Sequence, residues 1–307
     1  MKTDEAVAPV IAAMLVLAVI VTFFAVWNAT AIPSMKAQAE VTHLQEVESG
    51  ILQFSSDIDT AASTTSSMTL SERIPLGGGD ILYSSTKSGG VITIHNGSLS
   101  MVMDIYNTSG SGNYQKLDNS KFRLVNFSYQ PSGNFWQDQG YVWSQGYVNV
   151  TKGTLATPLE FSTMNAVNYN LTDALFSASS VSNASNPAEC TVLVLKGVNL
   201  RTAEARESVS GNGAGTLKLV STQKTDKFYN ITRVNVTISN SEQLSDFQDA
   251  MRKSVNGSLN KNVYSPLCGN VLYSDTYSTN STISLTIASI PNVTVIRQTT
   301  DIVLSAQ

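Results

Sequence analysis

The side chains in this chain that could most clearly carry chemistry are asparagines in Asn-x-Ser/Thr triplets, which occur twelve times. Outside a cell, the amide of such an asparagine can accept an N-linked glycan, which is bulky and solubilising. A β-rich composition with frequent Asn, Ser and Thr also raises the number of triplets by itself. The favoured glycosylation candidates are Asn96, Asn107, Asn126, Asn170, Asn183, Asn256 and Asn280, and the remaining triplets begin at Asn28, Asn149, Asn230, Asn235 and Asn292.

The chain has two cysteines, Cys190 and Cys268. In an oxidising compartment an even number of cysteines favours pairing, whereas a cytosolic chain keeps them as thiols. Two unrelated buried thiols are the alternative. We expect a disulfide between Cys190 and Cys268.

No pattern of a catalytic, metal-binding or cofactor-binding kind accompanies these residues. There is no G-x-S-x-G elbow and no Cys/His cluster with zinc-site spacing, and the carboxylates are scattered. The Gly-rich run 211–215 is too short for a phosphate loop and predicts a turn. The aromatics between 135 and 147 are more typical of core packing than of a carbohydrate platform. We therefore expect no catalytic residues, no metal and no cofactor.

The composition is typical of a surface protein that is rich in strands. Charged residues make up 14% of the 307 residues, against about 25% in an average domain. The formal net charge is −4 and no basic stripe is present, so a nucleic-acid partner is not expected. Thr-rich and Ser-rich runs suit the faces of sheets.

The segment from Val7 to Trp27 contains no charged residue. About 20 apolar residues in a helix span the hydrocarbon core of a bilayer, and a terminal Trp suits the membrane interface. A cleaved signal peptide is the alternative, but its apolar region is usually shorter, at about 7–15 residues. We expect a single membrane-spanning helix with the C-terminal part outside the cell.

Apolar residues continue after Pro33 at alternating steps of three and four, which predicts a helix with one apolar stripe. The stripe has two possible partners: the chain's own domain, or copies of the chain, for which it would be an assembly seam. Pro33 favours a kink or a short break between the two parts of the helix. The stripe consists of Leu44, Val47, Ile51, Phe54 and Ile58.

The run Ala6-Val7-Ala8-Pro9-Val10-Ile11 before the long apolar helix resembles the N-terminal domain of archaeal type IV pilins. The chain departs from that pattern at Ala8, where Ser is usual, and at Ala12, where Gly is usual. The resemblance implies cleavage of a short leader between Ala6 and Val7, which leaves the helix on the mature protein. It also implies assembly of the helix with copies of itself.

The expected fold class is α+β. A long N-terminal helix precedes a mainly antiparallel β-sandwich or jelly-roll-like domain, in which one late helix follows a cap at Asn240. The predicted segments are a leader at 1–6, the helix at 7–63, a linker at 64–72, a β-rich domain at 73–225 and a β-rich subdomain at 226–307 with a helix near 241–255.

Two functions are compatible with these features. The first is a pilin-like surface protein, anchored by its helix and assembled into a filament. The second is a monomeric, membrane-anchored binding or adhesion module that contacts a glycan or an envelope protein. The expected partners are membrane lipid, other copies of the chain or pilin-like subunits, and surface glycans.

Overall fold

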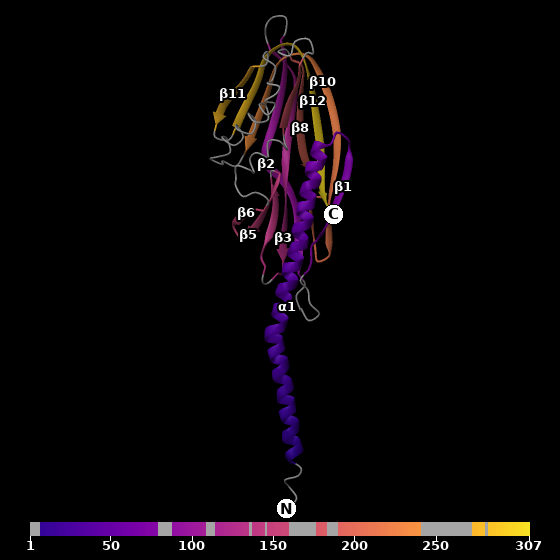
Figure 1. Cartoon of the computed structure of the whole chain (residues 1–307), viewed down its shortest axis with the longest axis vertical. Coiled ribbons are helices and arrows are strands. Elements are labelled where there is room, and N and C mark those ends of the chain that lie inside the picture. The colour runs from indigo at the N-terminus through magenta and orange to yellow at the C-terminus, as the bar shows by residue number, and fades with distance from the viewer. Residues whose placement is uncertain are drawn as a thin grey trace, which may run out of the picture.

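The protein, seen here as a computed structural model, combines one long helix with a large sheet (Figure 1). The structure describes residues 7–78, 88–108, 114–134, 137–144, 146–159, 176–182, 190–240, 272–279 and 282–307. The elements are α1 Val7–Ser63, β1 Met68–Pro75, β2 Gly89–Thr108, β3 Tyr114–Ser132, β4 Gly140–Ser144, β5 Tyr147–Lys152, β6 Leu155–Pro158, β7 Phe176–Ser182, β8 Cys190–Thr202, β9 Ser208–Gly211, β10 Ala214–Asn240, β11 Leu272–Thr279 and β12 Thr282–Ala306.

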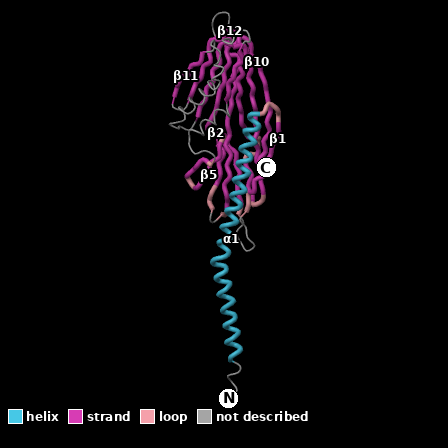
Figure 2. Tube along the Cα trace, in the orientation of Figure 1, coloured by secondary structure: helices cyan, strands magenta, loops and turns pink. Residues whose placement is uncertain are grey.

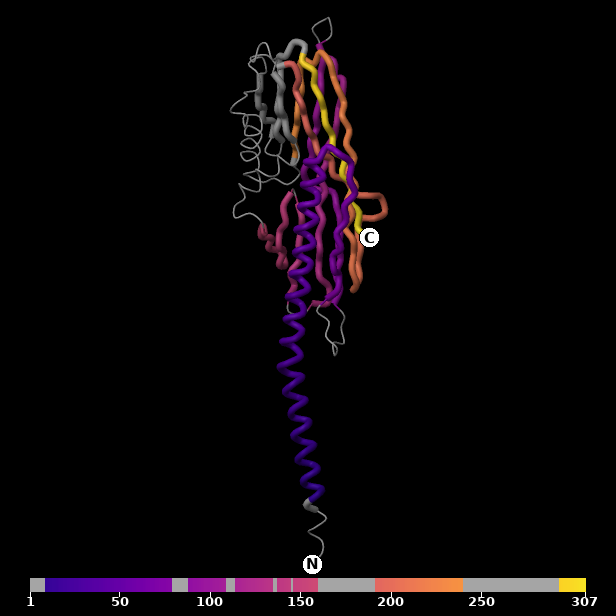
Figure 3. The backbone as a smooth tube through the Cα atoms, turned by 45° about the vertical axis from the view of Figure 1, so that its right-hand side comes forward, coloured from indigo at the N-terminus to yellow at the C-terminus, as the bar shows by residue number. Residues whose placement is uncertain are grey.

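Helix α1 projects from one end of the β-rich domain (Figure 2). Its N-terminal half stands clear of the sheet, and its C-terminal half runs alongside the strands in both views (Figures 1 and 3). This arrangement confirms the α+β layout of a long apolar helix followed by a mainly antiparallel domain. The helix is continuous through Pro33, so the predicted short break is absent.

Within the described residues, the sheet contains twelve strands. Nine follow the order β6-β5-β4-β3-β2-β10-β12-β8-β7, and β1, β9 and β11 pair with β10, β2 and β12, respectively. Among the described strand pairs only β8 and β12 are parallel. Strand β10 changes neighbour along its length. Its first part pairs with β1, its last part pairs with β2, and β12 follows it on the other edge.

The sheet bends back on itself, because β3 and β8 are in contact although three strands separate them in the sheet order. The backbone N–H of Arg123 on β3 donates to Asn199 Oδ1 on β8 at 2.9 Å. A Cβ at Gly197 would lie 2.6 Å from the ring of Phe122, so the absence of a side chain there permits this close contact. The fold is sandwich-like at this point, but it does not define a jelly roll.

Two predicted boundaries need correction. The linker at 64–72 is partly strand, because β1 begins at Met68. The boundary between 225 and 226 falls inside β10, a single strand of 27 residues, so the two predicted β-rich parts share one sheet. The leader at 1–6 and the helix near 241–255 lie outside the described residues.

The apolar stripe of α1 is buried against the chain's own sheet. Leu44, Val47, Ile51, Phe54 and Ile58 are each at most 4% exposed and belong to the main hydrophobic core. The ring of Phe54 packs edge-on against Phe127, which stacks on Trp143. The prediction that these five residues form an assembly seam is therefore wrong. The sheet offers an apolar face within the same chain, and burying the stripe there removes it from water.

Candidate functional site

The projecting part of α1 is an uncovered apolar surface. Its large apolar side chains between Val10 and Trp27 are 46–66% exposed. Soluble monomers rarely expose a contiguous apolar patch of more than a few hundred Å². This helix is the one in the described part of the chain that is long and apolar enough to cross a membrane. An apolar surface of this extent favours a non-aqueous cover, either lipid or protein.

The hydroxyl groups of Thr22, inside this segment, and of Thr30, just beyond it, are satisfied inside the helix. The Thr22 hydroxyl donates to the Ala18 carbonyl oxygen at 2.9 Å, and the Thr30 hydroxyl donates to that of Val26 at 2.8 Å. Hydrocarbon has no hydrogen-bonding groups, so polar groups of a helix in an apolar environment must form their hydrogen bonds within the protein. Phe23 stacks on Trp27 with ring centroids 6.2 Å apart. These aromatic rings mark the end of the apolar segment that is nearer the domain.

The helix enters the domain at Glu40, which is fully buried. Its Oε2 accepts a hydrogen bond from the backbone N–H of Gln137 at 3.1 Å. One turn later, His43 Nε2 lies 3.0 Å from the Tyr129 hydroxyl, which donates to the Leu76 carbonyl oxygen at 3.3 Å. Polar contacts therefore fix the point at which the free helix becomes part of the domain.

Two aromatic side chains of β4 extend this polar contact along the helix. The Tyr141 hydroxyl donates to Glu48 Oε2 at 2.9 Å, and Trp143 Nε1 donates to Ser55 Oγ at 3.0 Å. Each ring buries apolar area while its polar atom reaches one position on α1. These contacts fix the rotation of α1 about its own axis and its position along the strands. The sequence indicated the aromatics as core residues, but nothing in it identified α1 as their partner.

We expect Ser55→Ala to lower the free energy of unfolding by about 1–3 kcal/mol, because it leaves the buried indole N–H of Trp143 without its acceptor. Urea denaturation of the purified protein measures this. Ser56→Ala is the matched control, since Ser56 is exposed on the adjacent position. Equal stability of both variants would contradict the role of the hydrogen bond.

The two tyrosines make stability depend on alkaline pH. Burial raises the pKa of Tyr129 to about 12, and burial together with the hydrogen bond to Glu48 raises the pKa of Tyr141. The unfolded chain loses these protons from about pH 10, while the folded chain keeps them. Because the unfolded state then binds fewer protons, stability falls as pH rises.

We therefore expect the free energy of unfolding to fall between pH 10 and pH 12, and to fall less steeply in Tyr129→Phe. Denaturant titrations at several pH values give the slope of the free energy of unfolding against pH. This slope does not depend on the pH-independent loss of stability that removing the hydroxyl causes. Tyr229→Phe, which changes an exposed tyrosine, is the control. A slope in Tyr129→Phe equal to that of the wild type would exclude Tyr129 as a source of the pH dependence.

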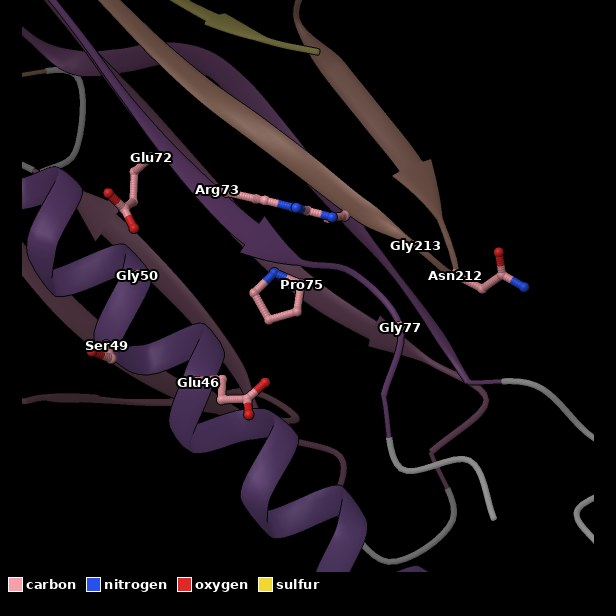
Figure 4. A pocket seen from close by; sticks show the side chains of 10 residues that line it. Glu46, Ser49, Gly50, Glu72, Arg73, Pro75, Gly77, Asn212 and Gly213 are labelled. Atoms are coloured by element: carbon pink, nitrogen blue, oxygen red, sulfur yellow. The ribbon is translucent and has the colours of Figure 1, made fainter. Parts of the chain in front are cut away.

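A groove of about 600 Å³ lies between α1 and β1 (Figure 4). Glu46 lies on its helix side, and Glu72 and Arg73 lie on its strand side. Burial, followed by the nearby charge of Asp57, raises the pKa of Glu72. Among the described residues, no group of three or more His, Cys, Asp or Glu side chains is placed to hold a metal ion. The groove therefore has a mixed polar lining without a defined chemistry.

The predicted modification sites separate into three groups. Asn96 is exposed on β2, whereas Asn107 and Asn126 are half-buried. The Oδ1 atom of Asn126 is buried without a hydrogen-bond partner, so this side chain is poorly placed to carry a glycan. Four candidates lie outside the described residues: Asn170, Asn183, Asn256 and Asn280.

The remaining predictions concern covalent processing. Val7 is the first described residue, and Ala6 lies outside the described residues, so cleavage between them stays a prediction. Cys190 begins β8. Its predicted partner, Cys268, lies outside the described residues, and the disulfide also stays a prediction.

Comparisons of the chain with protein-family models, with curated proteins and with solved structures find no match. The fold and the exposed surface nevertheless define a class of protein. It is a β-rich domain carried on a single N-terminal helix, whose free half is long and apolar enough to cross a membrane.

Proposed function

We propose that this chain is a pilin-like structural protein of the cell surface. Its apolar helix segment anchors it in the membrane, its β-rich domain lies outside the cell, and the same segment packs with copies of itself in a filament. One observation carries the proposal: a single helix presents an exposed apolar surface in its N-terminal half, and its C-terminal half is built into the core of a β-rich domain.

The continuity of α1 supports assembly over simple anchoring. A lone anchor serves equally well on a flexible linker. Here the helix runs without a break into the domain, where Glu40, Tyr141 and Trp143 hold it in place. In a helical assembly every subunit must take the same orientation relative to its neighbours. A rigid helix–domain connection meets that requirement.

The composition of the exposed segment also supports helix–helix contact. When membrane helices exchange contacts with lipid for contacts with each other, they gain little hydrophobic free energy. Close packing of small residues then becomes a main source of stability for the helix–helix contact. Small side chains recur at spacings of four, at Ala18 and Thr22 and at Ala25 and Ala29. These positions allow two helix backbones to approach.

The second candidate is a monomeric, membrane-anchored binding module. The burial of the stripe from Leu44 to Ile58 favours it, because no apolar stripe on the domain half of the helix remains for a partner. In that case lipid alone covers the segment from Val10 to Trp27, and the domain acts through its own surface.

Photo-crosslinking on intact cells separates the two candidates. A photoreactive residue is placed at Leu17 in the exposed segment, and in a control variant at Gln53 on the outer face of α1. The pilin-like function predicts protein–protein adducts from Leu17 in surface filaments seen by electron microscopy. Lipid adducts alone, with no filament that contains the protein, would reject assembly and support the monomeric module.

A further inference from the structure

We infer that Asn230 is a site of N-linked glycosylation, and that its glycan covers an open edge of strand β10. Asn230 begins the triplet Asn230-Ile231-Thr232. The inference rests on the outward placement of the domain in the proposed function. It does not depend on filament assembly.

The backbone presents Asn230 at an irregularity of β10. Phe228 pairs with Val295 and Ile231 pairs with Val293, so two residues of β10 stand opposite one residue of β12. This is the count of a β-bulge, in which the extra residue is unpaired and the strand bends. Asn230 has a φ of 55° there. Asn adopts this left-handed conformation more readily than most residues, which explains its place in the bulge.

The surroundings of Asn230 leave room for a sugar. Asn230 is exposed, and the preceding Tyr229 is 65% exposed. Thr232 supplies the hydroxyl that completes the triplet. The exposed ring of Tyr229 beside Asn230 offers an apolar face to the first sugar. Without such a cover, a large aromatic side chain exposed on a strand favours association with other chains.

Strand β10 has an open edge at this place. Its pairing with β1 ends at Ser221, and its pairing with β2 begins at Ile231. Between these residues, no strand in the described part of the chain covers that edge. Open edges invite pairing with other chains, and proteins protect them with lysines, with bulges or by covering the edge. Lys224 and Lys227 are exposed on this stretch, and a glycan at Asn230 adds a bulky hydrated group at its end.

Asn96 is the nearest comparison, because it is exposed and also borders a register shift. Its strand is paired with β3 there, and a Cβ at the adjacent Gly97 would lie 2.9 Å from the Leu124 carbonyl oxygen. The backbone after Asn96 is therefore crowded. Asn28, also exposed, lies directly beside Trp27 at the end of the apolar segment. Among the triplets whose exposure the structure describes, Asn230 combines distance from that segment with an uncovered edge.

The reaction needs a lipid-phosphate-linked oligosaccharide and a transferase of the cell surface. The Asn230 Nδ2 atom attacks the anomeric carbon of the first sugar, and the carbon–oxygen bond to the lipid phosphate breaks. A C–N bond forms, the lipid phosphate leaves with the bonding electron pair, and one amide proton passes to the transferase or to water.

Trypsin provides a direct test, because cleavage after Lys227 and Arg233 releases the peptide Phe228–Arg233 with a single triplet. We expect this peptide from protein purified from the cell surface to carry a glycan mass. Asn230→Gln and Thr232→Ala are expected to abolish the modification, whereas Thr232→Ser and Asn96→Gln are expected to retain it at Asn230.

Protease treatment of whole cells shows separately whether the domain lies outside. If the domain is digested on intact cells and the peptide Phe228–Arg233 is unmodified, the glycan inference is overturned and the outward placement stands. If the domain is protected from protease and the peptide is unmodified, both are overturned. A glycan that persists in Thr232→Ala would also overturn this assignment, because the triplet would not be its signal.

Discussion

Leu17→Arg is expected to remove the protein from the membrane and from any filament, while leaving the β-rich domain folded. Leu17 lies in the middle of the exposed apolar segment and is 62% exposed. Exchanging Leu for Arg at the centre of a membrane-spanning helix costs about 3 kcal/mol, which corresponds to a decrease of about 100-fold in partitioning. Fractionation of cells followed by immunodetection measures the membrane-bound and released protein.

The matched control for this prediction is Leu17→Met, which keeps the volume and the apolar character of the side chain. It should partition like the wild type. Thermal unfolding of the released Leu17→Arg protein should match that of the wild-type domain, because Leu17 lies far outside the buried stripe. Retention of Leu17→Arg in the membrane at the wild-type level would mean that this segment is not the anchor.

Ile51→Glu is expected to unfold the domain or to detach α1 from the sheet. Ile51 is 1% exposed in the middle of the stripe. Ile51→Ala should cost about 2–5 kcal/mol through the lost contacts and the cavity. Ile51→Glu should cost more, because it also buries a carboxyl group without a partner. Denaturation monitored by circular dichroism and by tryptophan fluorescence, to which the buried Trp143 contributes, follows both changes.

Gln53→Glu provides the control, since it places the same carboxylate on the exposed face of the helix two residues away. A shift of less than about 0.5 kcal/mol is expected for such a surface change. If Ile51→Glu were as stable as Gln53→Glu, the stripe would not be packed on the sheet. In that case, the effect of Ile51→Glu on filament formation would test whether these residues contact other copies of the chain.

The sequence determined the local features of the fold. A charge-free run and an alternating step of three and four predicted one helix over 7–63, and α1 spans Val7–Ser63. Short alternating runs predicted a mainly antiparallel domain, which is the observed layout. These features depend on propensity and on hydrophobic period, which act within a few residues and can be seen in one sequence.

The tertiary structure decided which surfaces meet. The stripe of α1 was compatible with its own sheet or with other copies, because periodicity gives a helix face without naming its partner. The boundary predicted between 225 and 226 failed because β12 pairs with β10 on both sides of the bulge at Phe228 to Ile231 and keeps it one strand, and such long-range pairing is not visible in the local sequence pattern.

The candidate sites show the same division. The sequence supplies twelve Asn triplets and two aromatics at Tyr141 and Trp143, but exposure and hydrogen bonding result from contacts between residues far apart in the chain. In the folded chain, the Oδ1 atom of Asn126 is buried and Asn230 lies at an open edge of β10. The indole N–H of Trp143 donates to Ser55 only because the fold brings β4 against α1. The apolar segment from Val10 to Trp27 is the exception, because its length and composition alone are enough to predict a helix that could cross a membrane.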